Sequence, residues 1–147
     1  MEMIMLQSYP VIFTPDENGT IIARFPDIPE AITVGKDLAK ALEWAQDALV
    51  VALSGYVEDQ RDIPRPSRPQ EKQKMVDLPP QTAMKLAIYQ GMRDQKITQT
   101  ELGNRMEVDG RQVRRILDLD HNTNLNHLVL ALKCLGKELV ISIRNAA

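Results

Sequence analysis

The sequence predicts an α+β protein in two parts, a β-β-β-α-β lobe over residues 1–79 and an all-α domain with a C-terminal strand over residues 80–147. Three observations predict this order. Short runs rich in Val, Ile and Phe come before the first long apolar helical stripe. A charged, proline-rich stretch then interrupts the chain, and closely spaced helix-capping residues follow it.

The charge distribution supports the same division. Residues 1–80 contain thirteen acidic and eight basic side chains, a net charge of −5, whereas residues 81–147 contain seven acidic and ten basic ones, a net charge of +3. Either imbalance alone would suit a solvated surface. Together they indicate different partners for the two parts, a basic one for the first and nucleic acid for the second.

The first lobe begins with a predicted β-hairpin. Residues 9–15 and 20–26 are its strands, and Asn18 and Gly19 suit the positive φ of the turn. After a turn at residues 26–29, residues 31–35 form a third strand. Asp37 then caps a helix that runs to about Tyr56 and ends near Gly55 and the acidic residues after it. The expected apolar stripe of this helix is Leu38, Leu42, Ala45, Leu49, Ala52, Leu53 and Tyr56.

A change of composition marks the middle of the chain. Residues 58–72 are rich in proline and charge and nearly free of apolar side chains, which predicts a linker or an extended edge segment. Residues 73–78 form one more strand that returns to the first sheet. Pro79 and Pro80 suit the entrance to a helix over residues 81–94, because a first-turn residue needs no backbone donor.

Three short helices are predicted after residue 97. Thr98 and Glu101 form a capping box for a helix over residues 99–106, and Asp109 caps another over residues 110–117. Thr123 or Asn124 caps the last helix, which stops at Gly136. Its apolar stripe is Leu125, Leu128, Val129, Leu132 and Leu135.

The C-terminal strand covers residues 138–143, with Leu139, Ile141 and Ile143 on one face. A small helical domain has no strand to pair with it. The sequence therefore predicts that these three residues pair with another subunit and make the chain a homodimer, with a dimer of dimers left open.

The first and second of these short helices carry the candidate binding residues. Two short helices joined by Glu107 and Val108, the second bearing arginines, are typical of a helix-turn-helix motif. Its first residues would meet base edges of operator DNA in the major groove. We expect base contacts from Arg111, Gln112 and Arg115, a phosphate contact from Arg114, and inward packing of Val113, Ile116 and Leu117. The alternative is an exposed polar helix face.

Residues 98–136 also resemble an Xre-type helix-turn-helix domain. The resemblance implies that the first motif helix contacts phosphate at its start, where this chain has Thr98 and Gln99. One departure is Glu107, which stands where the family usually has glycine. A non-glycine residue at positive φ costs on the order of 1 kcal/mol, so we expect a reshaped turn.

The first half resembles HicB antitoxins. The resemblance rests on a YPV strand, an FPDIPEA turn and the helix in GKDLAKALEWAQDAL. It implies a truncated RNase-H-like lobe that binds HicA, a small basic mRNA-cleaving toxin, and blocks its active site. The whole chain would then be an antitoxin that also represses its own operon. The alternative is an Xre-type transcriptional regulator whose first lobe senses a ligand or a different protein.

Catalytic and metal sites are not predicted. Asp16, Glu17, Asp27 and Glu30 fall in turns, where acids are common, and nothing sets carboxylates on adjacent strand centres. His121 and His127 lack other ligands at zinc spacing. We expect no enzyme activity and no cofactor.

The lone Cys134 is expected to be a packed side chain in a reducing compartment. No apolar run approaches the roughly 20 residues of a membrane span. These features predict a cytoplasmic protein without a membrane partner.

Overall fold

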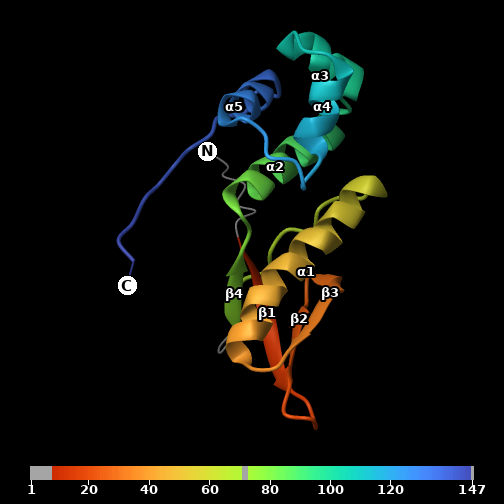
Figure 1. Cartoon of the computed structure of the whole chain (residues 1–147). Helices are drawn as coiled ribbons and strands as arrows, with labels where there is room; N and C mark the ends of the chain where they lie inside the picture. Colours follow the sequence, from red (N-terminus) through yellow and green to blue (C-terminus); the bar gives the residue numbers. More distant parts are fainter. Residues whose placement is uncertain (1–7, 71–72, 147) are drawn as a thin grey trace.

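A four-stranded antiparallel sheet covered by one long helix is followed by a group of four shorter helices (Figure 1). The computed structural model describes residues 8–70 and 73–146. The first lobe contains β1 (Ser8–Pro15), β2 (Ile21–Phe25), β3 (Ile28–Gly35), α1 (Leu38–Glu58) and β4 (Lys74–Asp77). The helical part contains α2 (Pro80–Gln95), α3 (Gln99–Met106), α4 (Gly110–Leu117) and α5 (Leu125–Cys134). The predicted α+β class is confirmed.

The strand order of the sheet is β3-β2-β1-β4. The predicted hairpin of β1 and β2 is confirmed: Gly19 has a φ of 79° and its N–H donates to the Asp16 carbonyl at 3.0 Å. The predicted return strand is also confirmed, because β4 pairs antiparallel with β1 and places Val76 opposite Tyr9. The first and last strands of the lobe therefore lie side by side, although β4 starts 66 residues after β1 in the sequence.

The third strand is longer than predicted. Only Pro26 and Asp27 form the turn, and β3 already begins at Ile28, opposite Phe25. The expected turn at residues 26–29 was therefore too long. The pairing is irregular between Arg24 and Phe25, and β3 is an edge strand of the sheet, which is where a proline such as Pro29 is tolerated because it lacks a backbone donor.

The helix α1 starts where the sequence predicts, since the Asp37 side chain accepts a hydrogen bond of 2.8 Å from the Lys40 N–H. It continues through Gly55 to Glu58, beyond the predicted end. Its buried stripe also differs: the side chains of Leu38 and Leu42 are 44% and 42% exposed. The buried positions are Ala41, Ala45, Leu49, Leu53 and Tyr56.

Close packing of α1 on the end of β3 explains why its buried side chains differ from the predicted ones. A Cβ atom on Gly35 would lie only 2.3 Å from the backbone nitrogen of Ala41. The helix backbone therefore lies directly against the end of β3. Larger side chains such as Leu38 and Leu42 find no room at that contact and remain half in solvent.

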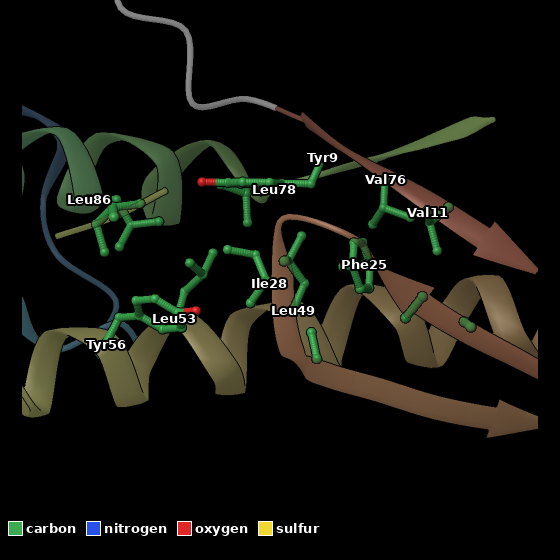
Figure 2. Close-up of a cluster of buried hydrophobic side chains, with 14 of the residues drawn as sticks. Tyr9, Val11, Phe25, Ile28, Leu49, Leu53, Tyr56, Val76, Leu78 and Leu86 are labelled. Carbon is green, nitrogen blue, oxygen red and sulfur yellow. The ribbon is translucent and has the colours of Figure 1, made fainter. Parts of the chain in front are cut away.

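The first core lies between the sheet and α1, and Figure 2 shows many of its side chains, among them Tyr9, Phe25 and Leu49. Part of the predicted linker packs against this core. Ile63 is buried, and the carbonyl of Pro64 accepts a hydrogen bond of 2.6 Å from the Tyr9 hydroxyl. Ser67 donates to the Asp27 carboxylate through its backbone N–H at 2.8 Å. The end of the predicted linker, residues 71–72, lies outside the described residues.

The helix α2 contributes to two cores. Leu86 and Tyr89 pack into the first core, whereas Ile88 and Met92 pack into a second core among the helices. The predicted start at the two prolines is confirmed, with Pro80 as the first helical residue. The other buried members of the second core are Ile97, Leu102, Met106, Val113, Ile116, Leu128, Ala131, Leu132 and Leu135.

The last helix ends as the sequence predicts, because Gly136 has a φ of 72° and its N–H donates to the Lys133 carbonyl at 2.9 Å. Its predicted stripe holds for Leu128, Leu132 and Leu135, but Leu125 is 52% exposed. The half-buried Cys134 packs against the second core.

The predicted C-terminal strand does not form within the single chain. Residues 138–143 have no regular secondary structure and belong to no sheet, and in the described part of the chain no strand pairs with them. A strand requires backbone hydrogen bonds to a neighbouring strand, and the helix α5 cannot supply them because its backbone groups bond within the helix. Pairing with a second subunit remains a prediction.

Candidate nucleic-acid interface

The two helices α3 and α4 have the bounds that their capping residues predict. The hydroxyl oxygen of Thr98 accepts a hydrogen bond of 3.1 Å from the Glu101 N–H, and the Asp109 carboxylate accepts one of 2.9 Å from the Gln112 N–H. The reciprocal half of the predicted capping box is replaced by an ion pair, in which the Glu101 carboxylate lies 2.8 Å from the Arg105 guanidinium. Each helix is therefore started by a local side-chain contact.

The connection between α3 and α4 places a glutamate in a conformation that favours glycine. Glu107 has a φ of 59° and a ψ of 43°, and the following Val108 N–H donates to the Gly103 carbonyl at 3.0 Å. The expected reshaping away from positive φ therefore does not occur. A Cβ on Gly103 would lie 3.1 Å from the Val108 carbonyl oxygen, so the small residue keeps α3 close to the turn.

The surface of α4 divides into an apolar face and a basic face. Val113 and Ile116 are buried and Leu117 is half-buried, as predicted. Arg111 and Arg114 are exposed, whereas Gln112 and Arg115 are half-buried. Positions three and four apart are neighbours on a helix surface, so the three arginines share one region.

In the described part of the chain, the three guanidinium groups of α4 have no acidic partner. Within residues 8–70 and 73–146, Arg111, Arg114 and Arg115 form no salt bridge and donate no side-chain hydrogen bond. Their charges are therefore available to an anion such as a phosphate group. This feature distinguishes α4 from α2 and α3, whose Arg93 and Arg105 are paired with Asp62 and Glu101 at 2.8 Å each.

Thr98 and Gln99 lie at the start of α3, where both are exposed. They line a cavity of about 530 Å³ between the end of α1 and the junction of α2 with α3. Glu58 of the first lobe lines the same cavity. The structure thus brings the predicted residues onto two adjacent helices, but it sets the α3 pair beside an acidic side chain that the sequence did not associate with them.

The residue that sequence reasoning missed is Lys85 of α2. Its side chain is 1% exposed, and its ammonium group donates to three backbone carbonyls, those of Arg115 at 2.9 Å, Asp118 at 2.6 Å and His121 at 2.6 Å. Burial lowers the pKa of Lys85, and the nearby Asp118 carboxylate opposes this effect. Lys85 stands three residues before Ile88 and seven before Met92, on the buried face of α2, but this spacing alone does not identify a buried lysine, because a lysine on a helix ordinarily faces water.

These contacts anchor the end of α4. The last carbonyls of a helix carry partial negative charge and have no partner within the helix, so a buried ammonium group is a favourable partner for them. Gln81 of α2 adds a second contact, because its side-chain oxygen accepts a hydrogen bond of 2.7 Å from the Thr123 N–H. The helix α2 therefore holds both α4 and the loop that leads to α5.

The sequence offers Thr123 and Asn124 as candidate caps of α5, and the structure assigns the cap to Asn124. Its side chain accepts a hydrogen bond of 2.8 Å from the Asn126 N–H. The hydroxyl of Thr123 instead donates to the Arg115 carbonyl at 3.3 Å. Thr123 is buried and belongs to the same group of contacts as Lys85.

The predicted pairing residues of the C-terminal segment differ in exposure. Leu139 is half-buried and packs against the second core, whereas Ile141 and Ile143 are 70% and 92% exposed. Large apolar side chains at such exposure are uncommon on a surface that faces only water.

The acidic candidates of the first lobe have structural partners. Asp27 accepts hydrogen bonds from Ser67, and Glu30 accepts one of 2.6 Å from the Tyr56 hydroxyl. Across the two described ranges, no three His, Cys, Asp or Glu side chains gather as a metal-binding group. Of the helices described, none combines the length and apolar character of a membrane span.

Comparison with known proteins identifies the family. Residues 8–87 match the model of the HicB-like antitoxin of bacterial toxin–antitoxin systems. The chain is 42% identical to Antitoxin HicB 1 of Photorhabdus laumondii over 135 residues, which cover 92% of this chain and 86% of that protein. It is 38% identical to Antitoxin HicB of Escherichia coli over 131 residues, 89% of this chain and 95% of that one. The family match spans more than half of the chain, from β1 into α2, and the chain therefore belongs to the HicB-like antitoxin family.

Proposed function

We propose that this protein is an antitoxin that neutralises a HicA-type mRNA-cleaving toxin and represses its own operon by binding operator DNA. The antitoxin part of the proposal is supported by the family match and by relatives named as antitoxins. The observation that carries the DNA-binding part is a set of three arginines on α4 that pair with no acid among the described residues, Arg111, Arg114 and Arg115.

The DNA contact proposed here uses α4 as the second helix of an Xre-type helix-turn-helix. The first residues of such a helix meet base edges in the major groove. The exposed Arg111 and the half-buried Arg115 would donate paired hydrogen bonds to guanine, and Gln112 would pair with adenine. Arg114, together with Thr98 and Gln99 at the start of α3, would hold phosphates. Two half-sites about one helical turn apart require a dimer.

The toxin contact proposed here uses the first lobe. Residues 1–80 have a net charge of −5, which suits a basic toxin through electrostatic complementarity. Neutralisation by occlusion needs no catalytic group and no cofactor. Because the proposed targets are an mRNA-cleaving toxin and operator DNA, the proposed location is the cytoplasm. The proposed operator with two half-sites implies a homodimer.

The DNA-binding part is tested by measuring how tightly arginine variants of the protein bind the DNA upstream of the gene. We expect Arg111→Ala to cost roughly 1–3 kcal/mol on the specific site and to relax the preference at one base pair. Arg114→Ala should weaken specific and random DNA alike and flatten the salt dependence. Equal losses for both variants on both kinds of DNA would contradict the assignment of base readout to Arg111.

The toxin part is tested separately by co-expression with the product of the adjacent reading frame. We expect a stoichiometric complex and relief of growth arrest. Operator binding without any toxin complex would favour the alternative, a transcriptional regulator whose first lobe senses another molecule.

A further inference from the structure

A groove runs beside α1 on the open edge of the sheet. It is formed by β3 and by the side of α1 that faces this edge, and it encloses about 340 Å³. Its apolar lining comes from Ile32, Ala48, Val51 and Ala52, and Glu30 and Asp59 lie among its polar residues. We call it the α1–β3 groove.

The apolar side chains of this groove are unusually exposed. Val51 is 70% exposed and Ile32 is 50% exposed, although both are β-branched residues that favour burial. Trp44, seven residues before Val51 and so on the same side of α1, is 44% exposed. Clustered apolar surface of this kind, next to polar residues, is typical of a protein interaction site.

The charges around the groove are predominantly negative. Glu30 is neutralised by Arg61, whose guanidinium lies 3.6 Å from its carboxylate and 3.9 Å from the centre of the Tyr56 ring. Asp59, the other acid of the groove, forms no ion pair with any described residue, and neither does the exposed Asp47, which lies one turn of α1 from Val51. The groove is therefore an apolar surface that carries the unpaired carboxylate of Asp59, with that of Asp47 nearby on α1.

We propose that the α1–β3 groove is the surface on which the first lobe binds its basic toxin, through apolar side chains flanked by Lys or Arg. This inference rests on the proposed function, and it adds which face of the lobe contacts the toxin. Basic groups of the toxin meet the unpaired carboxylates, and its apolar groups cover Val51, Ile32 and Trp44.

A second copy of the chain is a poorer occupant. A contact between two copies through this groove would gather the unpaired carboxylates of both chains in one interface, and like charges across an interface are costly. Simple addition of a strand to β3 is also disfavoured. The irregular pairing after Ile28 and the missing donor of Pro29 are features that protect an edge strand from such pairing.

The experiment compares variants of the full chain in titration calorimetry with the HicA-type protein of the adjacent reading frame, purified in an inactive form. Val51→Arg and Asp59→Lys each place a positive charge in the groove. Both positions are exposed, so both variants should fold, as circular dichroism checks. We expect each to weaken toxin binding by at least roughly tenfold.

Glu17→Lys is the matched control, because it makes the same change of charge as Asp59→Lys. Glu17 lies in the turn between β1 and β2, at the opposite end of the lobe from the end of α1 (Figure 1). We expect its affinity to stay within about twofold of the wild type, since exposed charges farther apart than a Debye length of about 8 Å are largely screened.

The outcomes separate the inference from the proposed function. Wild-type binding with equal affinity for all three variants would overturn the groove assignment and leave the antitoxin function standing. A Val51→Arg variant that loses oligomerisation in light scattering but keeps toxin binding would make the groove a contact between copies and would also overturn it. Absence of wild-type binding would overturn both.

Discussion

The ammonium group of Lys85 donates a hydrogen bond of 2.9 Å to the backbone carbonyl of Arg115, the residue of α4 that is proposed to contact bases. Two further bonds, to Asp118 and His121, complete its contacts. The helix α2 therefore fixes the end of α4 through a single buried side chain, while Leu86 next to it packs into the core of the first lobe.

Replacing Lys85 with Met should destabilise the helical part strongly. The variant keeps an apolar chain of similar length but removes a charged donor from three carbonyls. Those of Arg115 and Asp118 keep other donors, whereas that of His121 loses its hydrogen bond to Lys85, and a bond from a charged donor contributes about 1.5–3 kcal/mol. We expect the free energy of unfolding, measured with urea, to fall by at least about 2 kcal/mol. Lys133→Met, at an exposed position of α5, should change it by less than about 0.5 kcal/mol. Similar values for both variants would show that the Lys85 bonds contribute little.

Glycine at position 107 should stabilise the protein. Glu107 sits at positive φ, and a side chain in that region costs roughly 1–2 kcal/mol, although glycine also gains entropy in the unfolded chain. We expect Glu107→Gly to raise the free energy of unfolding by up to about 1 kcal/mol. Glu101→Gly, inside α3, should lower it by about 0.5 kcal/mol or more. A loss of stability at both positions would argue against strain at Glu107.

Stability in acid should depend on the bond between Tyr56 and Glu30. The Tyr56 hydroxyl, followed by the Arg61 guanidinium, holds the pKa of Glu30 below its ordinary value. A carboxyl with a lowered pKa in the folded state contributes stability above its unfolded pKa of about 4.3, and this contribution is lost as the pH falls through the folded pKa. We therefore expect a smaller loss of stability in acid for Tyr56→Phe than for the wild type, measured by urea unfolding at stepped pH.

Tyr89→Phe is the control for that experiment. The Tyr89 hydroxyl donates to the carbonyl of Arg61 at 2.8 Å and not to a carboxylate. The variant should lose stability equally at every pH. An unchanged pH dependence in Tyr56→Phe would mean that Glu30 does not contribute through this bond.

A charge on the C-terminal segment should disrupt the proposed dimer. Ile141 is 70% exposed, and with Ile143 it forms the proposed pairing face. We expect Ile141→Lys to become monomeric in light scattering and to lose operator affinity, because two half-sites need a dimer. Ser142→Lys places the same charge on the other face of an extended chain and should remain dimeric. A dimeric Ile141→Lys variant would place the interface elsewhere.

The proposed boundary at residue 79 can be tested with two fragments. The fragment of residues 1–79 lacks Leu86 and Tyr89, which α2 inserts into the first core. It should fold only marginally, whereas residues 1–95 should be more stable by at least about 2 kcal/mol, since a buried Leu or aromatic side chain contributes roughly 1.5–3 kcal/mol. Both should bind toxin if folded, and neither should bind operator DNA. Equal stability would mean that α2 is dispensable to the first lobe.

The sequence alone determined the parts of this protein that depend on local contacts. Thr98 and Asp109 each accept a hydrogen bond from the residue three positions later, and the helices that they start have the predicted bounds. The β1–β2 hairpin likewise depends on a turn with Gly19 at positive φ. Such features can be predicted because all the interacting groups lie within a few residues of one another.

Only the tertiary structure decided the features that depend on distant segments. The close approach of α1 to Gly35 buries Ala41 in place of Leu38, and the position of β3 at the edge lets Pro29 enter a strand. The burial of Lys85 has the same origin. Its three acceptors lie 30 to 36 residues away, and without them a lysine on a helix is expected to face water, so hydrophobic periodicity could not assign it to the interior.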